Sequence, residues 1–228
     1  MIVFDESSHT YTNTDTNRKY TSVTTLLGKY KKPFDSHTHS LRVAEREGVT
    51  QQFVLESWKE TTKIATDRGT KIHLLMENFI KNGETVDGYT YLYKSYEKAV
   101  QKDVGSYKSI QSEKLLFEHN YEVAGTADLI YENKDSFVIG DFKTNKKFRY
   151  SSDFNEYLTA PVDHLTYCEF NSYALQLSMY AYMHEQLSGK KCNKIVIFYL
   201  QEDRWQSIVC NYLKSDILNI LKHYRLSL

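Results

Sequence analysis

Apolar side chains alternate or run together in four segments of the chain, which predicts β-strands over residues 111–118, 121–131, 136–143 and 193–200. A fifth segment, 204–211, has a weaker strand pattern. Residues 137–143 and 195–200 are apolar on both faces, a pattern typical of central strands that are covered by helices on either side.

A helical period follows in other segments. Apolar residues recur at spacings of three and four over residues 64–81, which predicts a packed helix that ends before Gly83. Similar patterns predict helices over 91–102, 169–187 and 213–225. Residues 36–62 are polar with few apolar positions, and we expect them to be helical. The first 22 residues, rich in Thr and Tyr, predict a small hairpin that leads into a short helix over 23–30, and Pro33 breaks the pattern.

The predicted order is helix, three strands, helix and strand, which indicates a mixed α/β layer architecture. A chain of 228 residues can build one sizeable domain with an elaboration. We expect residues 1–64 to form a substrate-engaging region and residues 65–228 to form the core, the two making one compact domain.

Composition and charge exclude several classes. The net charge is zero, so no overall field draws the protein to nucleic acid or membrane. Residues 18–71 hold 11 Lys and Arg against 6 acids, which fits either a phosphate-facing surface or solvated helix faces. The N-terminus does not resemble a signal peptide, and no apolar run is long enough for a membrane span. We expect a cytoplasmic protein of a bacterial cell or a phage-infected host, with no membrane partner.

Three ionisable residues interrupt the apolar segments around residues 123–144. Asp141 and Lys143 share one face of their strand because side chains alternate with a period of two. The polar turn at 132–136 brings Asp128 alongside. Burying these groups requires compensation. A structural Asp–Lys ion pair would provide it, and so would a divalent cation held by the carboxylates.

Two helices carry further candidates. His73 precedes Glu77 by four residues, so the two share a helical face, and Gln176 and Tyr180 have the same relation. Taken singly, each pair also fits polar residues at the boundary of a core.

The order of these motifs is informative. The series G-x-x-x-H, G-T-x-D-L-I, D-x-K-T and Q-x-x-x-Y resembles the RecB-type branch of the PD-(D/E)xK nucleases over residues 65–200. The stretch YTSVT at 20–24 is similar to the start of the mitochondrial genome maintenance exonucleases and their phage relatives. This resemblance implies a restriction-endonuclease-like αβββαβ core, a mixed central sheet flanked by helices, with a mainly helical N-terminal elaboration.

The resemblance also implies roles. His73, Asp128 and Asp141, with the backbone carbonyl of Phe142, would bind one or two Mg²⁺ or Mn²⁺ ions, and Lys143 would lie beside the attacking water. Gln176 and Tyr180 would position the lysine or the phosphate, and Glu77 and Glu113 are secondary candidates. Family members with an iron–sulfur cluster need four cysteines. The three cysteines here are Cys168, Cys192 and Cys210, with no CxxC spacing, so we expect no cluster.

The implied function is a metal-dependent DNA exonuclease that acts on single-stranded ends in phage-type replication or recombination, with a replication or recombination protein as a potential partner. An endonuclease, a double-strand-end resection nuclease, a nucleic-acid-binding or inhibitory module, and a structural domain with an ion-paired hairpin remain alternatives. We expect DNA to contact Tyr20, Ser22, Lys29, Lys31, Lys32, Arg68, Lys71, Thr144, Lys146 and Lys147, together with Trp58.

Overall fold

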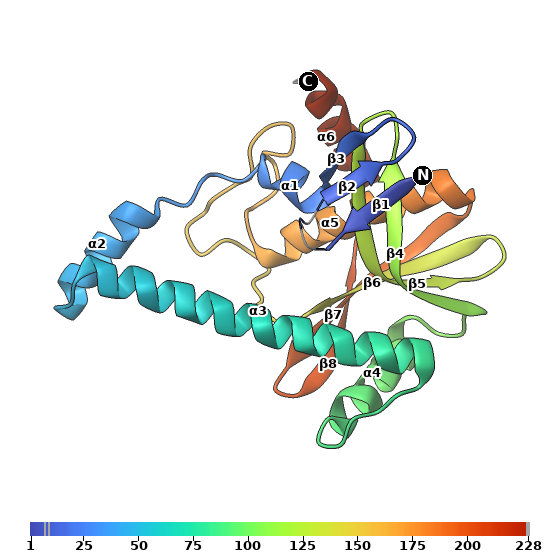
Figure 1. The fold of residues 1–228 in the computed structure, drawn as a ribbon, viewed down its shortest axis with the longest axis horizontal. Coiled ribbons are helices and arrows are strands. Elements are labelled where there is room, and N and C mark those ends of the chain that lie inside the picture. The colour runs from blue at the N-terminus through green and yellow to red at the C-terminus, as the bar shows by residue number, and fades with distance from the viewer. Residues whose placement is uncertain (7, 9, 227–228) are drawn as a thin grey trace.

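An eight-stranded sheet runs through the part of the chain described by the computed structural model, which comprises residues 1–6, 8 and 10–226 (Figure 1). The strand order is β1-β2-β3-β5-β6-β7-β8, and β4 pairs with β5 outside this path. The strands are β1 (Ile2–Asp5), β2 (Thr10–Asn13), β3 (Arg18–Ser22), β4 (Ser109–Glu118), β5 (Val123–Glu132), β6 (Ser136–Lys143), β7 (Lys191–Gln201) and β8 (Arg204–Cys210).

Helices cover both faces of this sheet. One face packs against α1 (Val23–Gly28), α5 (Glu169–Ser188) and α6 (Lys214–Leu226), and the other packs against α4 (Thr90–Asp103) and the C-terminal half of α3 (Gln51–Asn82). The predicted order of helix, three strands, helix and strand is confirmed by α3, β4–β6, α5 and β7. Among the described residues, no helix combines the length and hydrophobicity that a membrane span requires.

The central position of β6 explains its continuous apolar sequence. Phe137 and Ile139 belong to the core under α5, whereas Val138 and Phe142 belong to the core under α3 and α4. Alternate side chains therefore enter opposite cores, as the period of two requires. β7 lies between parallel β6 and antiparallel β8, which confirms both predicted central strands.

The first three strands extend the sheet rather than standing apart from it. β1, β2 and β3 form an antiparallel meander, and β3 joins the main sheet through a short parallel pairing of Thr21 and Ser22 with the start of β5. The predicted N-terminal hairpin is thus a three-stranded edge of the same sheet.

The helix boundaries upstream of residue 64 differ from the expectation. Instead of one helix over 36–62 and another over 64–81, α2 (Ser36–Glu47) ends at Gly48, and α3 continues unbroken from Gln51 to Asn82. Gly48 has φ +67°, which ends α2, and the Thr50 side chain accepts the N–H of Phe53 to cap α3. Residues 62–64 are helical throughout. The boundary that we expected between the substrate-engaging region and the core, after residue 64, therefore lies inside α3.

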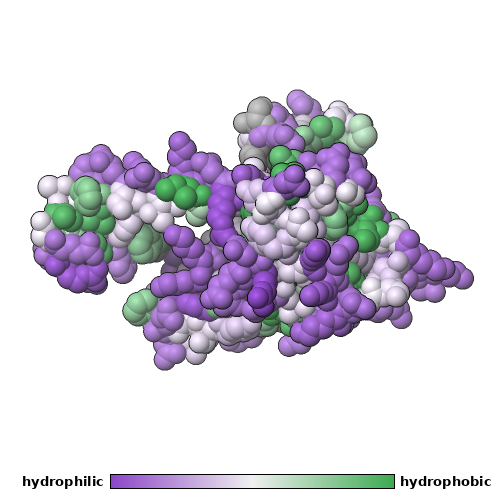
Figure 2. Space-filling view, turned by 90° about the horizontal axis from the view of Figure 1, so that it is seen from below, coloured by the Kyte–Doolittle hydropathy of each residue, from purple (hydrophilic) through white to green (hydrophobic). Residues whose placement is uncertain are grey.

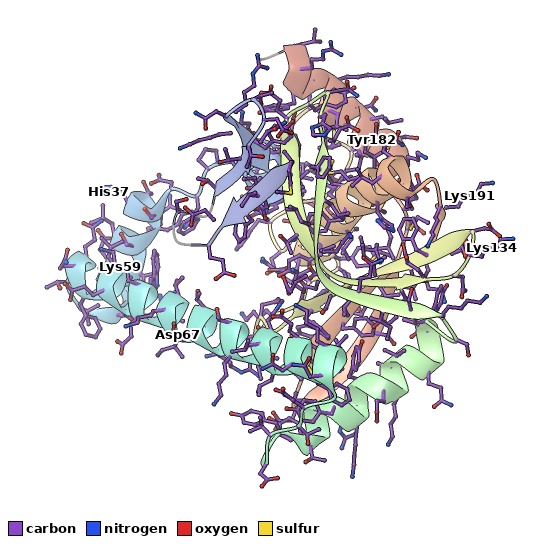
Figure 3. The ribbon with its side chains drawn as sticks, turned by 45° about the vertical axis from the view of Figure 1, so that its right-hand side comes forward. His37, Lys59, Asp67, Lys134, Tyr182 and Lys191 are labelled. Carbon is purple, nitrogen blue, oxygen red and sulfur yellow. The ribbon has the colours of Figure 1, made fainter. Side chains whose placement is uncertain are left out.

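α2 and the N-terminal half of α3 form an arm that projects from the body (Figure 1). His37, Lys59 and Asp67 mark its course in Figure 3. The arm buries few side chains, namely Ser40, Ala44 and Val54, and exposes the large apolar residues Leu41, Phe53 and Ile64.

Candidate functional site

β5 and β6 separate at the centre of the sheet, and this fork positions the site. The two strands pair from Leu129–Gly140 to Glu132–Phe137, and beyond Leu129 the start of β5 pairs with β3 instead. At the fork the carboxylate of Asp128 accepts a hydrogen bond from the backbone N–H of Phe142, 2.8 Å away. The fork thus places the polar side chains of two strands side by side without leaving that buried N–H unpaired.

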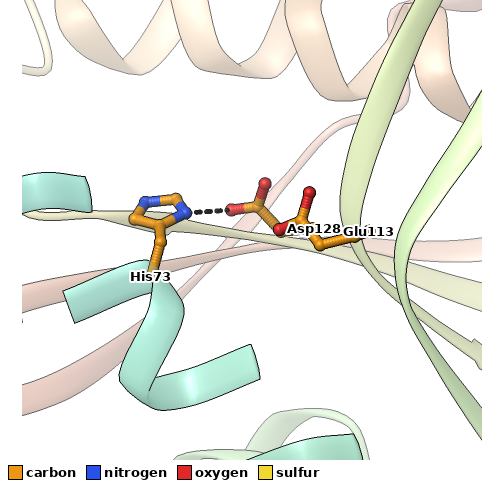
Figure 4. Close-up of side chains that lie close together, drawn as sticks. All are labelled: His73, Glu113 and Asp128. Atoms are coloured by element: carbon orange, nitrogen blue, oxygen red, sulfur yellow. Dashed lines mark ion pairs between the residues drawn. The ribbon is translucent and has the colours of Figure 1, made fainter. Parts of the chain in front are cut away.

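Three side chains from different elements converge beside this fork (Figure 4). His73 comes from α3, Glu113 from β4 and Asp128 from β5, and each offers one ligand atom within 4.8 Å of the others. His73 Nδ1 lies 3.4 Å from Asp128 Oδ2. Two carboxylates and one imidazole suit a hard or borderline divalent cation, so the donor set fits the Mg²⁺ or Mn²⁺ that the family resemblance implied.

Glu113 reaches the cluster through an unusual backbone conformation. Its φ is +51°, in the left-handed region that non-glycine residues rarely occupy. The pairing of β4 with β5 keeps the same register before and after this residue, because Ser112 pairs with Leu129 and Lys114 pairs with Ala127. Glu113 therefore lies opposite Asp128. Such conformations cost about 1–3 kcal/mol and concentrate at functional sites.

Without a bound cation, the surroundings of the cluster favour the protonated form of the Glu113 and Asp128 carboxyl groups. Glu113 is exposed on one side, yet partial desolvation by the surrounding side chains, together with the negative charges of Asp128 and Glu77, raises its pKa to about 8. Burial and the charge of Asp141 raise the pKa of Asp128 to about 6, although His73 and Lys143 oppose this shift. A cation would replace these protons and stabilise the carboxylates in their ionised form.

Asp141 and Lys143 form a buried ion pair next to the cluster. Their side chains are only 2% and 17% exposed. The Lys143 ammonium also lies 4.8 Å from the centre of the Tyr173 ring. Burial alone would lower the pKa of Lys143, but the charges of Asp141 and Asp128 outweigh it and raise that pKa, so the side chain stays cationic.

The group formed by His73, Glu113 and Asp128 differs at one position from the side-chain ligands that the family resemblance implied. His73 and Asp128 belong to both, while Glu113 takes the third place and the Asp141 carboxylate contacts Lys143. Asp141 remains close enough for its charge to act on Asp128. Glu77 lies near Glu113 and pairs with Lys81 on its own helix.

α5 packs on the face of the sheet opposite α3 and supports the fork from there. Gln176 Nε2 donates a hydrogen bond to the Tyr180 hydroxyl at 3.3 Å. Tyr180 is buried against Gly125, where an added Cβ would come within 2.6 Å of the Tyr180 ring. Tyr180 therefore packs the helix onto β5 at the fork, and burial raises the pKa of its hydroxyl.

A groove of about 540 Å³ leads from the arm to Lys143. Its α3 wall carries Thr62, Thr66 and Gly69 at spacings of three and four, followed by His73. Small side chains on this face leave the space open. Gly69 also permits close approach, since an added Cβ would lie 3.2 Å from Thr144 Oγ1.

Some of the expected DNA-contacting residues border this groove. Thr144 and Lys146 line it, and Arg68 donates a hydrogen bond to the Thr144 carbonyl at 3.0 Å. Lys147 is exposed next to Lys146, and Lys71 lies 5.0 Å from the centre of the Tyr89 ring in an adjoining cavity.

The other expected contacts lie on β3, α1 and the linker to α2, and the expectation for Tyr20 needs correction. The Tyr20 ring is 8% exposed, and its hydroxyl lies 2.6 Å from His119 Nδ1, so the ring is not available for base stacking. Ser22 caps α1. Lys29 and Lys31 lie over the rings of Tyr224 and Tyr167, and Lys32 is exposed.

Tyr173 was missed from the sequence. Besides the contact with Lys143, its hydroxyl donates to Asn145 Oδ1 at 3.1 Å, and it lines the groove. Its position in the sequence could have indicated this role, because Tyr173 precedes Gln176 by three residues and so lies on the same face of the helix.

Most of the chain matches one known protein family. The family model described as the PD-(D/E)XK nuclease superfamily matches residues 44–215, which is more than half of the chain. None of the curated proteins matches significantly. Similar solved structures include the protein SSO0001, with 13% identity and a TM-score of 0.38 over 90% of this chain and 74% of the other. A candidate exonuclease from Eubacterium rectale has 12% identity and a TM-score of 0.41, over 93% of this chain and 81% of that one.

Both TM-scores are low, so the assignment rests on the family match. The matched region contains the fork, the His73–Glu113–Asp128 group and the Asp141–Lys143 pair. It also includes the αβββαβ series of elements, which is consistent with the restriction-endonuclease-like fold expected from the sequence. The chain belongs to the PD-(D/E)XK nuclease superfamily.

Proposed function

We propose that the protein is a divalent-metal-dependent deoxyribonuclease that hydrolyses phosphodiester bonds as an exonuclease from single-stranded ends, in phage-type DNA replication or recombination. The observation that carries this proposal is the convergence of His73, Glu113 and Asp128 beside the buried Lys143, at the end of a groove open to solvent. The Asp141–Lys143 pair beside this group is largely buried, and buried charge is costly unless it is compensated or serves a site.

The proposed ligands are His73, Glu113 and Asp128, with Asp141 and the Phe142 carbonyl as adjoining candidates. Mg²⁺ or Mn²⁺ bound there would offset phosphate charge and lower the pKa of a water molecule. Lys143, fixed by Asp141 and the Tyr173 ring, would orient the attacking water and balance negative charge that develops on the phosphate. Because its pKa is raised, Lys143 suits a cationic role better than that of a general base.

The groove supports a strand as substrate. Its walls carry hydroxyl and amide groups together with Lys146, and it reaches Lys143 from the direction of the arm. Phosphates can accept hydrogen bonds from such groups without regard to base sequence. Arg68, Lys71 and Lys147 add positive charge around it.

The test is digestion of 5′- and 3′-labelled single- and double-stranded oligonucleotides with Mg²⁺ or Mn²⁺. We expect cleavage from single-stranded ends by the wild type and a loss of cleavage in Asp141→Asn. Asp135→Asn, at an exposed acid in the β5–β6 turn, is the matched control and should cleave normally.

Other outcomes identify the alternatives. Cutting of a circular single strand would indicate an endonuclease, and degradation confined to duplex ends would indicate a resection enzyme. Binding without cleavage by the wild type, with either metal, would contradict the nuclease proposal and favour a binding or inhibitory module.

A further inference from the structure

A second groove, of about 940 Å³, lies between α4 and the end of the β7–β8 hairpin. We propose that it binds the phosphate backbone of a single-stranded stretch of the substrate, outside the site where cleavage takes place. This inference rests on the proposed function for the identity of the strand. The residues that would contact it are Lys94, Lys98, Lys102 and Arg204, with Tyr91 at one end.

Positive charge lines this groove in a regular row. Lys94, Lys98 and Lys102 follow one another at intervals of four along α4, so they share one helical face, and Arg204 stands on β8 across the groove. All four side chains belong to exposed residues. Among the described residues, Lys94, Lys98 and Arg204 form no ion pair, which leaves their charges free for a ligand.

The acids nearby do not cancel this charge. Glu202 and Asp203 are the acids that line the groove, against four basic residues. Asp103, next to the groove, pairs with Lys102 at 3.4 Å and accepts a hydrogen bond from the Ser207 hydroxyl. This pair cancels, which leaves Lys94, Lys98 and Arg204 against the two acids. The lining therefore carries net positive charge in a chain whose total is zero, and it is complementary to a polyanion.

An aromatic residue distinguishes a nucleic acid from an acidic protein as the occupant. Tyr91 lines the groove and is 39% exposed as a residue, so a base could stack on its ring. Basic grooves that also present exposed aromatic rings are typical of sites for single-stranded nucleic acid. Figure 2 views the molecule from the side of α3 and α4, and shows mostly hydrophilic residues over this face of the body.

The groove is continuous with the surface around the candidate active site. Tyr91 and Asp203 also line a cavity of about 430 Å³ that contains Arg68 and Lys71. Arg68 in turn donates to the Thr144 carbonyl in the wall of the groove that leads to Lys143. A strand held at Lys143 can therefore extend past Arg68 and Lys71 to the row of lysines on α4.

The floor of the groove is joined to the site by packing. Trp205 lines the groove, is buried, and packs against Phe142 with ring centroids 4.8 Å apart and the ring planes tilted by 47°. Phe142 in turn contacts the His73 ring edge-to-face at 5.9 Å. The floor of the groove and the candidate metal site are therefore connected through the Phe142 ring.

The experiment compares the triple variant Lys94→Gln/Lys98→Gln/Arg204→Gln with the wild type. Binding of a long and a short labelled single-stranded oligonucleotide is measured in EDTA, over a series of salt concentrations. We expect weaker binding of the long oligonucleotide. The slope of log affinity against log salt should fall by about 2, since each lost phosphate contact on a single strand contributes about 0.7. The loss should be greater for the long oligonucleotide than for the short one.

The matched control removes the same charge elsewhere, in Lys134→Gln/Lys191→Gln/Lys222→Gln, all of which are exposed. Lys134 and Lys191 lie together at the side of the molecule remote from the arm (Figure 3). Equal binding and equal salt slopes for the groove variant and this control would overturn the proposal, as would a wild type that does not bind the long oligonucleotide. A groove variant that loses binding of poly-glutamate but not of DNA would also overturn it, and would identify an acidic protein as the occupant.

Lysine acetylation of the unmodified protein gives a second measurement that is independent of folding of the variants. The long oligonucleotide should protect Lys94 and Lys98 from acetylation and leave Lys134 reactive, and equal reactivity of all three would overturn the proposal. Because these measurements use no metal, they separate failure of the groove from failure of the nuclease activity, which is decided by the digestion with Mg²⁺ or Mn²⁺.

Discussion

The carboxylate of Asp128 accepts the backbone N–H of Phe142 at 2.8 Å, across the point where β5 and β6 part. This hydrogen bond joins the strand that carries one acid to the strand that carries Asp141 and Lys143. The same carboxylate lies 3.4 Å from His73. Asp128 therefore has a structural role at the fork as well as a proposed role as a ligand, and substitutions can separate the two.

Asp128→Asn should abolish cleavage while the fold persists. The amide oxygen can still accept the Phe142 N–H, but the neutral side chain is a poor ligand, so we expect activity to fall by about 100-fold or more. Asp128→Ala should in addition lose about 1–3 kcal/mol of stability because the buried N–H would have no acceptor. Chemical denaturation and a cleavage assay measure the two effects. Equal stability of the two variants would contradict the structural role.

The Asp141–Lys143 pair should behave as a coupled unit. Lys143→Met leaves the Asp141 carboxylate buried without its cation, and we expect a loss of about 3–5 kcal/mol in the free energy of unfolding. The double variant Asp141→Asn/Lys143→Met should recover much of that stability but none of the activity. A double-mutant cycle by urea denaturation measures the coupling, and additive effects of the single substitutions would refute it.

The pKa of Glu113 predicts how the stability of the metal-free protein depends on pH. The folded protein holds this proton up to about pH 8, whereas the unfolded chain releases it near 4.5. Between these values the folded state binds more protons, so the free energy of unfolding should fall as the pH rises. Asp128, whose pKa is raised to about 6, acts in the same direction at lower pH.

Thermal unfolding in EDTA from pH 5 to 9 measures this dependence, and Glu113→Gln is the control because it removes the titrating group. We expect a flatter profile for the variant. Added Mn²⁺ should raise the Tm of the wild type more at pH 8 than at pH 6, because cation binding requires the ionised carboxylates. Identical profiles for wild type and variant in EDTA would contradict the raised pKa of Glu113.

Gly125 is predicted to be intolerant of a side chain. In Gly125→Ala the new Cβ would lie within 2.6 Å of the Tyr180 ring and 3.1 Å of Val23, so we expect α5 to shift and stability to fall by about 1–3 kcal/mol. Gly28→Ala is the control, since no atom lies within 4 Å of its added Cβ. A second substitution, Tyr180→Leu, should restore part of the stability of Gly125→Ala. Denaturation midpoints measure these differences, and a fully stable Gly125→Ala would show that the packing is looser than the structure indicates.

The sequence by itself determined the order of the elements and the family. The apolar pattern of residues 136–143 and 193–200 predicted central strands, and β6 and β7 occupy that position because both of their faces enter a core. The motifs that hold His73, Asp128 and Lys143 also follow from local sequence, and the family match covers all three. Such features depend on residues close together in the chain, where periodicity carries the information.

Tertiary structure decided which side chains meet. Glu113 enters the ligand group because the β4–β5 register places it opposite Asp128 with a left-handed backbone, and neither the register nor the φ angle can be read from residues 109–118 alone. Tyr20 is buried because β3 joins β5 at the edge of the sheet. The basic groove likewise requires α4 to lie beside β8, where the Trp205 N–H donates to the Ser95 hydroxyl, 110 residues earlier in the chain. Contacts between distant segments are set by packing and strand pairing, which the local pattern of apolar residues does not specify.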